Sequence, residues 1–189
     1  MEPATFITGA LIVLIVGGGL GYLISIYNTL VLLGQNVEKA WSNIDVLLQQ
    51  RHDELLNLVE TCKGYLKHER EVLEEVTRLR RGFERAATID EKARTENLLN
   101  QAFGRLRLAM EAYPDLKASQ NLLQLQGRIT ALESSTADRR EFYNDSVNMY
   151  NVQIGSFPDL LLARLFAYRP HEFLEVPAES KKTVKVTLT

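Results

Sequence analysis

Residues 37–65 read VEKAWSNIDVLLQQRHDELLNLVETCKGY, and the spacing of their apolar side chains decides the fold class. Alternating steps of four and three residues from Val37 reach apolar side chains at eight of nine positions, with Arg51 as the exception. A period near 3.5 residues is typical of a helix that packs against other helices. The stretch therefore predicts a long helix in an all-α fold. The nine seam positions are Val37, Trp41, Ile44, Leu48, Arg51, Leu55, Leu58, Cys62 and Tyr65.

The sequence upstream of this helix carries no Asp, Glu, Lys or Arg from residue 3 to residue 37. Residues 6–26, FITGALIVLIVGGGLGYLISI, form an apolar run whose helix would rise about 31 Å, which is the thickness of a bilayer's hydrocarbon core. We expect a single transmembrane helix that continues into the bundle. Residues 1–5 form a short tail without the basic residues of a cleaved signal peptide, so we expect the span to be retained.

Two features of this region favour contacts with another helix. Gly17 and Gly21 form a small-xxx-small pair that allows helix backbones to approach closely in a membrane, although glycine is also common in membrane helices without such a role. Residues 27–37 extend the apolar stretch beyond what lipid covers. We therefore predict a juxtamembrane association surface at Leu30, Leu33 and Val37, with Trp41 as a packing anchor.

Two shorter helices are expected after the long one. The first ends near Gly82, where small residues begin. Thr88 then caps the next, because a Thr followed three residues later by Glu91 has the pattern of a capping box. That helix ends before Pro114, since the residue preceding a proline avoids the helical conformation.

A fourth long helix is predicted to open at Pro114 or Asp115 and to end before Pro158. Residues 38–157 then form an antiparallel bundle of three to four long helices. Residues 158–189 hold a short amphipathic helix and a flexible tail, in which alternating apolar residues indicate a weak strand or disorder. The alternating residues are Val184, Val186 and Leu188.

Charge and composition narrow the function classes. The 22 basic and 24 acidic residues nearly balance, so the chain lacks the basic surface of a nucleic-acid-binding protein. One Cys and three His exclude a disulfide framework and the spacing of a zinc site. Basic residues appear only after the span, first at Lys39 and Arg51, which predicts an external N-terminus and a cytoplasmic bundle. A free Cys62 fits a reducing compartment.

Four separated motifs carry a resemblance to a known family. The chain resembles the bacterial LemA family over about residues 27–173. The resemblance implies a membrane-anchored helical protein of the bacterial envelope, in the inner or plasma membrane, without established enzymatic activity. The motifs are YNTLV from Tyr27, VEKAWSNIDVLLQQRHDELLNLVETCKGYLKHE from Val37, YPDLKA from Tyr113 and YNDSVNMYNVQIGSFP from Tyr143.

The sequence gives no pattern for a catalytic, cofactor or metal site, so we expect no enzyme. His68 and Glu69 begin like a zinc-protease motif, but the second His is missing. Tyr143 and Tyr150 share a stripe, for which core packing with hydrogen-bonded hydroxyls is favoured over a ligand pocket. Arg51, a polar seam residue, is expected to pair with carboxylates on an opposing helix and to fix register.

We therefore predict a self-associating helical scaffold or adaptor, with the lipid bilayer, further copies of the chain and other envelope proteins as partners. The alternative is an oligomeric membrane pore or transport component. An uncharged span argues against that alternative, because transport pathways usually contain ionisable residues.

Overall fold

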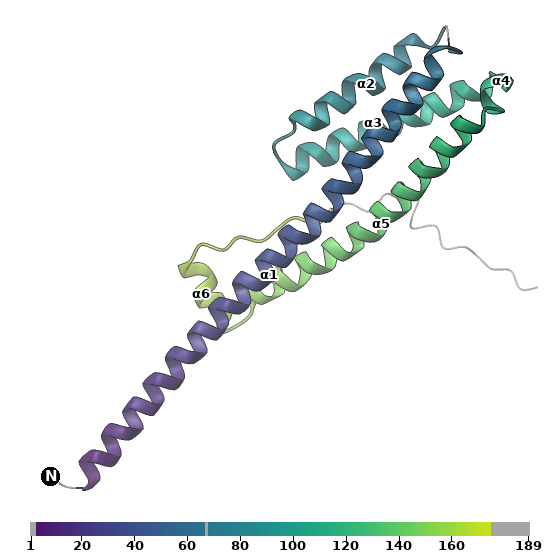
Figure 1. Cartoon of the computed structure of the whole chain (residues 1–189). Helices are drawn as coiled ribbons and strands as arrows, with labels where there is room; N and C mark the ends of the chain where they lie inside the picture. Colours follow the sequence, from purple (N-terminus) through teal and green to yellow (C-terminus); the bar gives the residue numbers. More distant parts are fainter. Residues whose placement is uncertain (1–2, 67, 175–189) are drawn as a thin grey trace, which may run out of the picture. The chain divides into compact units, whose positions relative to one another are not determined.

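The computed structural model describes residues 3–66 and 68–174, and every regular element in these ranges is an α-helix (Figure 1). The predicted all-α class is confirmed. The alternating residues predicted at Val184, Val186 and Leu188 lie outside the described residues. The helices are α1 (Pro3–Lys63), α2 (Arg70–Arg85), α3 (Ile89–Glu111), α4 (Pro114–Lys117), α5 (Gln120–Gly155) and α6 (Asp159–Leu165).

The predicted span and the seam from Val37 to Cys62 lie on one uninterrupted helix, α1, whereas Tyr65, predicted as the last seam position, follows the end of the helix and is 46% exposed. No proline follows Pro3 until Pro114, so nothing in this stretch removes a backbone donor from the helical ladder. The long helices α1 and α5 each take part in two compact units. One unit holds residues 3–42 and 140–174 among those described, and the other holds residues 43–139.

Among the described residues of the unit 43–139, most of the buried apolar side chains form one cluster, the core. The seam predicted from the heptad spacing contributes Leu55, Leu58 and Cys62, which are all buried. Each later helix adds its own apolar stripe, as expected for amphipathic helices that pack around one core. The remaining core residues are Val59, Leu66, Leu73, Val76, Leu99, Ala102, Leu106, Met110, Leu116, Leu122 and Ile129.

The start of α3 is the capping box that its sequence predicts. The Glu91 backbone N–H donates to Thr88 Oγ1 at 3.2 Å, and the Glu91 carboxylate accepts from the backbone N–H groups of Ala87 and Thr88 at 2.9 and 3.3 Å. These backbone donors lower the pKa of the Glu91 carboxyl. The helix boundary is therefore set locally by side-chain chemistry.

The predicted fourth helix differs from the structure at its start. Pro114 begins only the short helix α4, and α5 begins at Gln120. The short helix α4 buries Leu116 completely in the core. Ser119 then accepts the first hydrogen bond of the following helix, from the Leu123 backbone N–H at 3.1 Å. A serine in this position is a favourable helix start.

The other unit packs the part of α1 from residue 26 to residue 42 against the end of α5 and against α6, which lies beside α1 in Figure 1. From α1, buried side chains begin at Ile26 and continue with Leu30, Val37 and Ala40. Every described side chain before Ile26 is exposed. The partners from α5 and α6 are Tyr143, Val147, Tyr150, Ile154 and Ala163.

Candidate functional site

The exposed part of α1 has the properties of a membrane span. Its most apolar 18-residue window has a mean hydropathy of 2.2 and contains no buried residue. Residues 7–25 are all exposed, and a helix of this length rises about 28 Å, close to the hydrocarbon thickness of a bilayer. Packing by the rest of the unit begins immediately afterwards, at Ile26.

One side of this helix carries small residues. Gly17, Gly21 and Ser25 follow one another at four-residue spacing, and Asn28 and Leu32 continue the same side of the helix. We call these five residues the small-residue face. All of them are exposed, and a Cβ atom added at Gly17 or Gly21 would meet no atom within 4 Å.

A shallow concavity lies on this face where α1 leaves the predicted span. Its volume is about 400 Å³, and its lining comes from α1 alone. Small side chains next to larger ones create such a hollow, into which a side chain of another helix can fit. The lining residues are Gly21, Ile24, Ser25, Asn28, Thr29 and Leu32.

The predicted juxtamembrane residues lie on a different side of α1. Leu30 and Val37 are 0% and 2% exposed, so the chain's own packing already covers them, and Leu33 is half-buried. Successive helix residues are rotated by about 100°, which places Leu30 nearly opposite Gly17 and Gly21. One partner helix therefore cannot contact both the glycine pair and the predicted juxtamembrane residues. The half-buried Trp41 packs edge-on against Tyr143, with ring centroids 6.2 Å apart.

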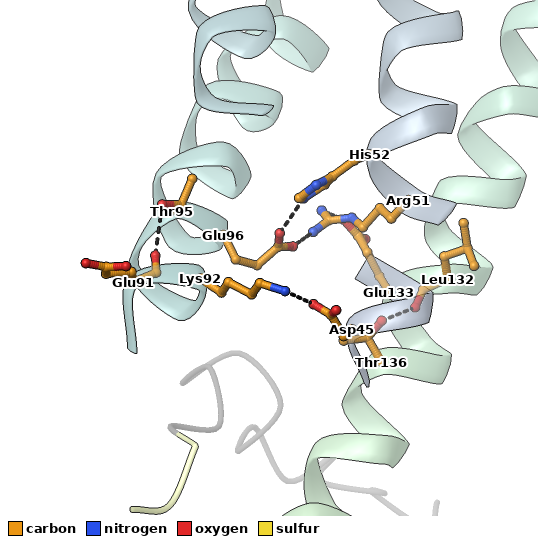
Figure 2. A network of polar contacts seen from close by, with 10 residues as sticks. All are labelled: Asp45, Arg51, His52, Glu91, Lys92, Thr95, Glu96, Leu132, Glu133 and Thr136. Carbon is orange, nitrogen blue, oxygen red and sulfur yellow. Dashed lines mark hydrogen bonds and ion pairs between the residues drawn. The ribbon is translucent and has the colours of Figure 1, made fainter. Parts of the chain in front are cut away.

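The unit of residues 43–139 contains a buried polar network (Figure 2). The Arg51 guanidinium donates to the carboxylates of Glu96 on α3 and Glu133 on α5, and so links three helices. His52 Nε2 donates to Glu96 Oε2 at 2.8 Å, and its ring stands edge-on to the Phe83 ring at 4.2 Å. The side chains of Arg51, His52 and Glu96 are 3%, 3% and 1% exposed.

A second ion pair flanks this network. Lys92 Nζ donates to Asp45 Oδ1 at 2.5 Å and lies 5.2 Å from the centre of the Phe83 ring. Figure 2 shows that Lys92 and Glu96 come from the same helix while Asp45 comes from α1. Since a one-turn shift of α3 along α1 would separate both pairs at once, these contacts fix the register of the two helices. Arg51 thus pairs with carboxylates on opposing helices, as predicted.

The segment after α6 is held against α5 by two asparagines. The Asn144 carboxamide donates to the Leu174 carbonyl at 2.9 Å and accepts from the Leu174 N–H at 2.8 Å. Asn151 makes the same pair of bonds with the backbone of His171, both at 2.9 Å. Asn144 and Asn151 are seven helical residues apart, and His171 and Leu174 are three extended residues apart, and both separations are about 10 Å. The two asparagines can therefore bind the extended segment at both ends at once. We call residues 171–174 the strap.

The two tyrosines that precede these asparagines also contact this region. Tyr143 Oη donates to the Glu172 carbonyl at 3.3 Å, and the Tyr150 ring lies 4.9 Å from the His171 ring. Burial raises the pKa of both phenols above the ordinary value, with a smaller contribution from Glu172 at Tyr143 and from Tyr168 at Tyr150. The two Tyr-Asn pairs, which lie seven residues apart on α5, therefore bind the chain's own strap.

The single cysteine is in the core. Cys62 is fully buried, its thiol lies 3.6 Å from the Met110 sulfur, and burial raises its pKa to about 11. A thiol in this state has little nucleophilic thiolate at neutral pH. The described residues contain no group of three or more His, Cys, Asp or Glu positioned to hold a metal ion.

A cationic groove runs along α2. Its volume is about 1010 Å³, and apolar side chains such as Leu66 and Leu73 line it together with Glu74. Arg70 pairs with Glu74 at 2.7 Å and Lys63 pairs with Glu60, so Arg78, Arg81 and Arg85 supply the excess positive charge that favours negatively charged groups in the groove. The basic lining residues are Lys63, Arg70, Arg78, Arg81 and Arg85.

An exposed apolar helix of membrane-spanning length, continuing into packed helical units, defines a membrane-anchored helical protein. The chain belongs to the LemA family, whose model matches residues 40–188. Two relatives are magnetosome protein MamQ 1 and magnetosome protein MamQ 2 of Paramagnetospirillum magneticum. Each is 25% identical over an alignment that covers 80% of this chain. The chain spans 66% of the length of these relatives.

Sequence reasoning missed Glu96 and the two asparagines. Glu96 lies three residues before Leu99 and so continues the apolar stripe of α3 backwards, a position where a carboxylate indicates a buried partner. Asn144 and Asn151 each directly follow a tyrosine of the predicted stripe, but the strap that they bind follows them by 20 to 30 residues. Only the folded chain shows that contact.

Proposed function

We propose that the chain is a scaffold or adaptor of the bacterial envelope that anchors in the membrane and self-associates through the small-residue face of α1. The observation that carries the proposal is the free surface around Gly17 and Gly21, which continues along one side of the helix to Leu32. The chain's own α5 and α6 pack on the other side of α1, at Leu30 and Val37, so the small-residue face remains accessible to a second α1.

Backbone approach at the two glycines favours association inside the membrane, where close van der Waals packing replaces the hydrophobic effect. Asn28 adds an exposed carboxamide just beyond the predicted span, which can hydrogen-bond to its counterpart in a second copy. The proposal assigns no catalytic step to the chain. The relatives' description as magnetosome proteins of a bacterium supports a bacterial setting.

An adaptor also needs a surface for a second protein. The cationic groove on α2 fits an acidic peptide segment that carries apolar side chains, because basic residues surround the apolar Leu66 and Leu73. Reversing charge at Arg78 and Arg81 should remove binding of such a segment without altering self-association.

The test of self-association compares two double variants of the full chain in detergent by light scattering and sedimentation. Gly17→Leu with Gly21→Leu should shift the protein toward the monomer, because two isobutyl groups block close approach of the backbones. Gly9→Leu with Gly19→Leu adds the same apolar volume on other sides of the helix and should leave the assembly unchanged. A wild-type chain that is monomeric at all concentrations, or equal behaviour of both variants, contradicts the proposal.

The proposed orientation, with the N-terminus outside and the packed units in the cytoplasm, needs a reporter other than Cys62, which is buried. Ser135→Cys introduces an exposed thiol on α5. In intact cells an impermeant maleimide should leave this thiol unmodified and should label it after membrane permeabilisation. Labelling before permeabilisation contradicts the orientation.

A further inference from the structure

The helix α6 lies where the predicted span ends. The ring of Phe166, at the end of α6, is 5.1 Å from the ring of Tyr27 on α1. Tyr27 follows the exposed segment 7–25 by two residues. If that segment fills the hydrocarbon core, Tyr27 and α6 lie at the depth of the lipid headgroups, where aromatic residues are favoured.

The helix α6 has one packed side and one apolar outward side. Ala163 and Asp159 are buried, and the Asp159 carboxylate accepts from Gln153 Nε2 at 2.9 Å. On the outward side, Leu161 and Leu165 lie one helical turn apart and are 60% and 75% exposed, and Phe157, in the turn that precedes α6, is 81% exposed. We call these three residues the α6 apolar stripe.

The charge around the stripe is positive. Arg164 and Arg169 are both exposed, whereas the one acidic residue of α6, Asp159, is buried and hydrogen-bonded. Exposed apolar side chains beside basic ones are the pattern of helices that lie in a membrane interface and bind anionic lipids.

We infer that α6 is a second membrane contact, which lies in the headgroup region of an anionic bilayer beside the span. The α6 apolar stripe inserts at the boundary between headgroups and acyl chains, and Arg164 and Arg169 bind lipid phosphates. Two observations select the lipid surface as the occupant: the ring contact between Tyr27 and Phe166 holds α6 at the end of the span, and the basic residues complement anionic headgroups. Because α6 packs on α1, this membrane contact limits how far the span can tilt or rotate in the bilayer.

The experiment uses the full chain with Cys62→Ala, reconstituted in phosphatidylcholine liposomes with or without phosphatidylglycerol. An environment-sensitive fluorophore is attached at Leu165→Cys, and the liposomes contain lipids with a quencher near the headgroup. The matched control is Phe142→Cys, because Phe142 is an exposed aromatic on α5 next to the Trp41–Tyr143 contact. Trp41 lies fourteen helical residues, or about 21 Å, beyond Tyr27. Circular dichroism checks that the labelled chains are folded.

We expect the probe at position 165 to lose most of its emission and the probe at position 142 to lose little. Arg164→Gln with Arg169→Gln should reduce quenching at position 165 only when phosphatidylglycerol is present. Equal quenching at positions 165 and 142 overturns the lipid contact, and an absence of any effect of phosphatidylglycerol overturns the role of the two arginines.

A second copy of the chain is the other occupant that the experiment can detect. If unlabelled Leu165→Cys forms disulfide-linked dimers while the labelled probe escapes lipid quenching, the stripe is a protein interface and the inference is wrong. The Gly17→Leu, Gly21→Leu variant should show the same quenching at position 165 as the parent chain. Lipid contact by α6 and self-association of α1 therefore succeed or fail separately.

Discussion

The carboxamide of Asn144 exchanges two hydrogen bonds with the backbone of Leu174, thirty residues further along the chain. The donated and accepted bonds are 2.9 and 2.8 Å long, and Asn151 repeats the arrangement with His171. A backbone segment bound in this way uses the same pairs of groups as a strand at the edge of a sheet, with a side-chain amide in place of the second strand.

Asn144→Ala should release the Leu174 end of the strap. Two hydrogen bonds are lost, each worth roughly 0.5–1.5 kcal/mol, so the free energy of unfolding should fall by about 1–3 kcal/mol. Hydrogen exchange of the Leu174 amide should accelerate. Asn148→Ala, at an exposed asparagine one turn away on α5, should change neither quantity. Unaltered exchange at Leu174 in the Asn144 variant would show that the strap is held by other contacts.

Glu96→Gln should destabilise the unit of residues 43–139. The charge of Glu96 balances the buried Arg51 and accepts from His52, so its removal leaves a buried cation with only the more exposed Glu133 as a partner. Breaking a buried pair on one side costs about 3–5 kcal/mol.

Urea unfolding of the full chain in detergent measures the effect of Glu96→Gln. Glu71→Gln removes an exposed carboxylate in the same unit and should shift the midpoint by less than about 0.5 kcal/mol. Equal midpoints for the two variants would mean that the network contributes nothing to stability.

Cys62 should make stability fall at alkaline pH. In the folded chain the thiol pKa is about 11, whereas an unfolded chain has an ordinary thiol pKa of about 8.5. The folded state therefore retains its proton longer, and the contribution of this group is complete below about pH 8 and is lost as the pH rises toward 11.

Unfolding at neutral and alkaline pH should show a smaller loss of stability in Cys62→Ala than in the parent chain. A thiol reagent should react with Cys62 only as the chain unfolds, whereas it should react at once with Ser135→Cys. Fast reaction of Cys62 in the folded chain would contradict its burial.

Gly34 should tolerate alanine but not leucine. A Cβ atom at Gly34 would lie 3.7 Å from Tyr150 Cε2, an ordinary contact distance, so Gly34→Ala should gain up to about 1 kcal/mol of helix propensity. Gly34→Leu adds three further carbons beside the Tyr150 ring and should lose about 1–3 kcal/mol through overpacking. Gly127→Leu, at an exposed position of α5, should not lose stability. Thermal unfolding of the three variants provides the comparison.

Local patterns predicted the parts of the fold that depend on short-range order. The buried Leu55, Leu58 and Cys62 follow from a heptad period, and the start of α3 follows from Thr88 and Glu91. The break between α4 and α5 could not be predicted in this way. It depends on burying Leu116 in a core assembled from several helices, and tertiary packing of this kind overrides the helix propensity of the residues around it.

The candidate association surfaces also differ in how far the sequence alone could predict them. Gly17 and Gly21 are recognisable from spacing alone, because their role depends on one helix. The burial of Leu30 and Val37 is visible only when α5 packs beside α1, although both residues were predicted as an association surface. The apolar stretch that follows the span, residues 27–37, is thus covered in part by other helices of the same chain.

The order of the strap contacts has a mechanical consequence. Tension applied at Leu174 and directed sideways, away from α5, reaches the bonds at Asn144 first, then those at Asn151, and only then α6 and its ring contact with Tyr27. The strap therefore peels one asparagine at a time. A partner that pulls on the C-terminal end would detach α6 from the end of the span only after both asparagines have yielded, so a weak load would leave the base of the protein undisturbed.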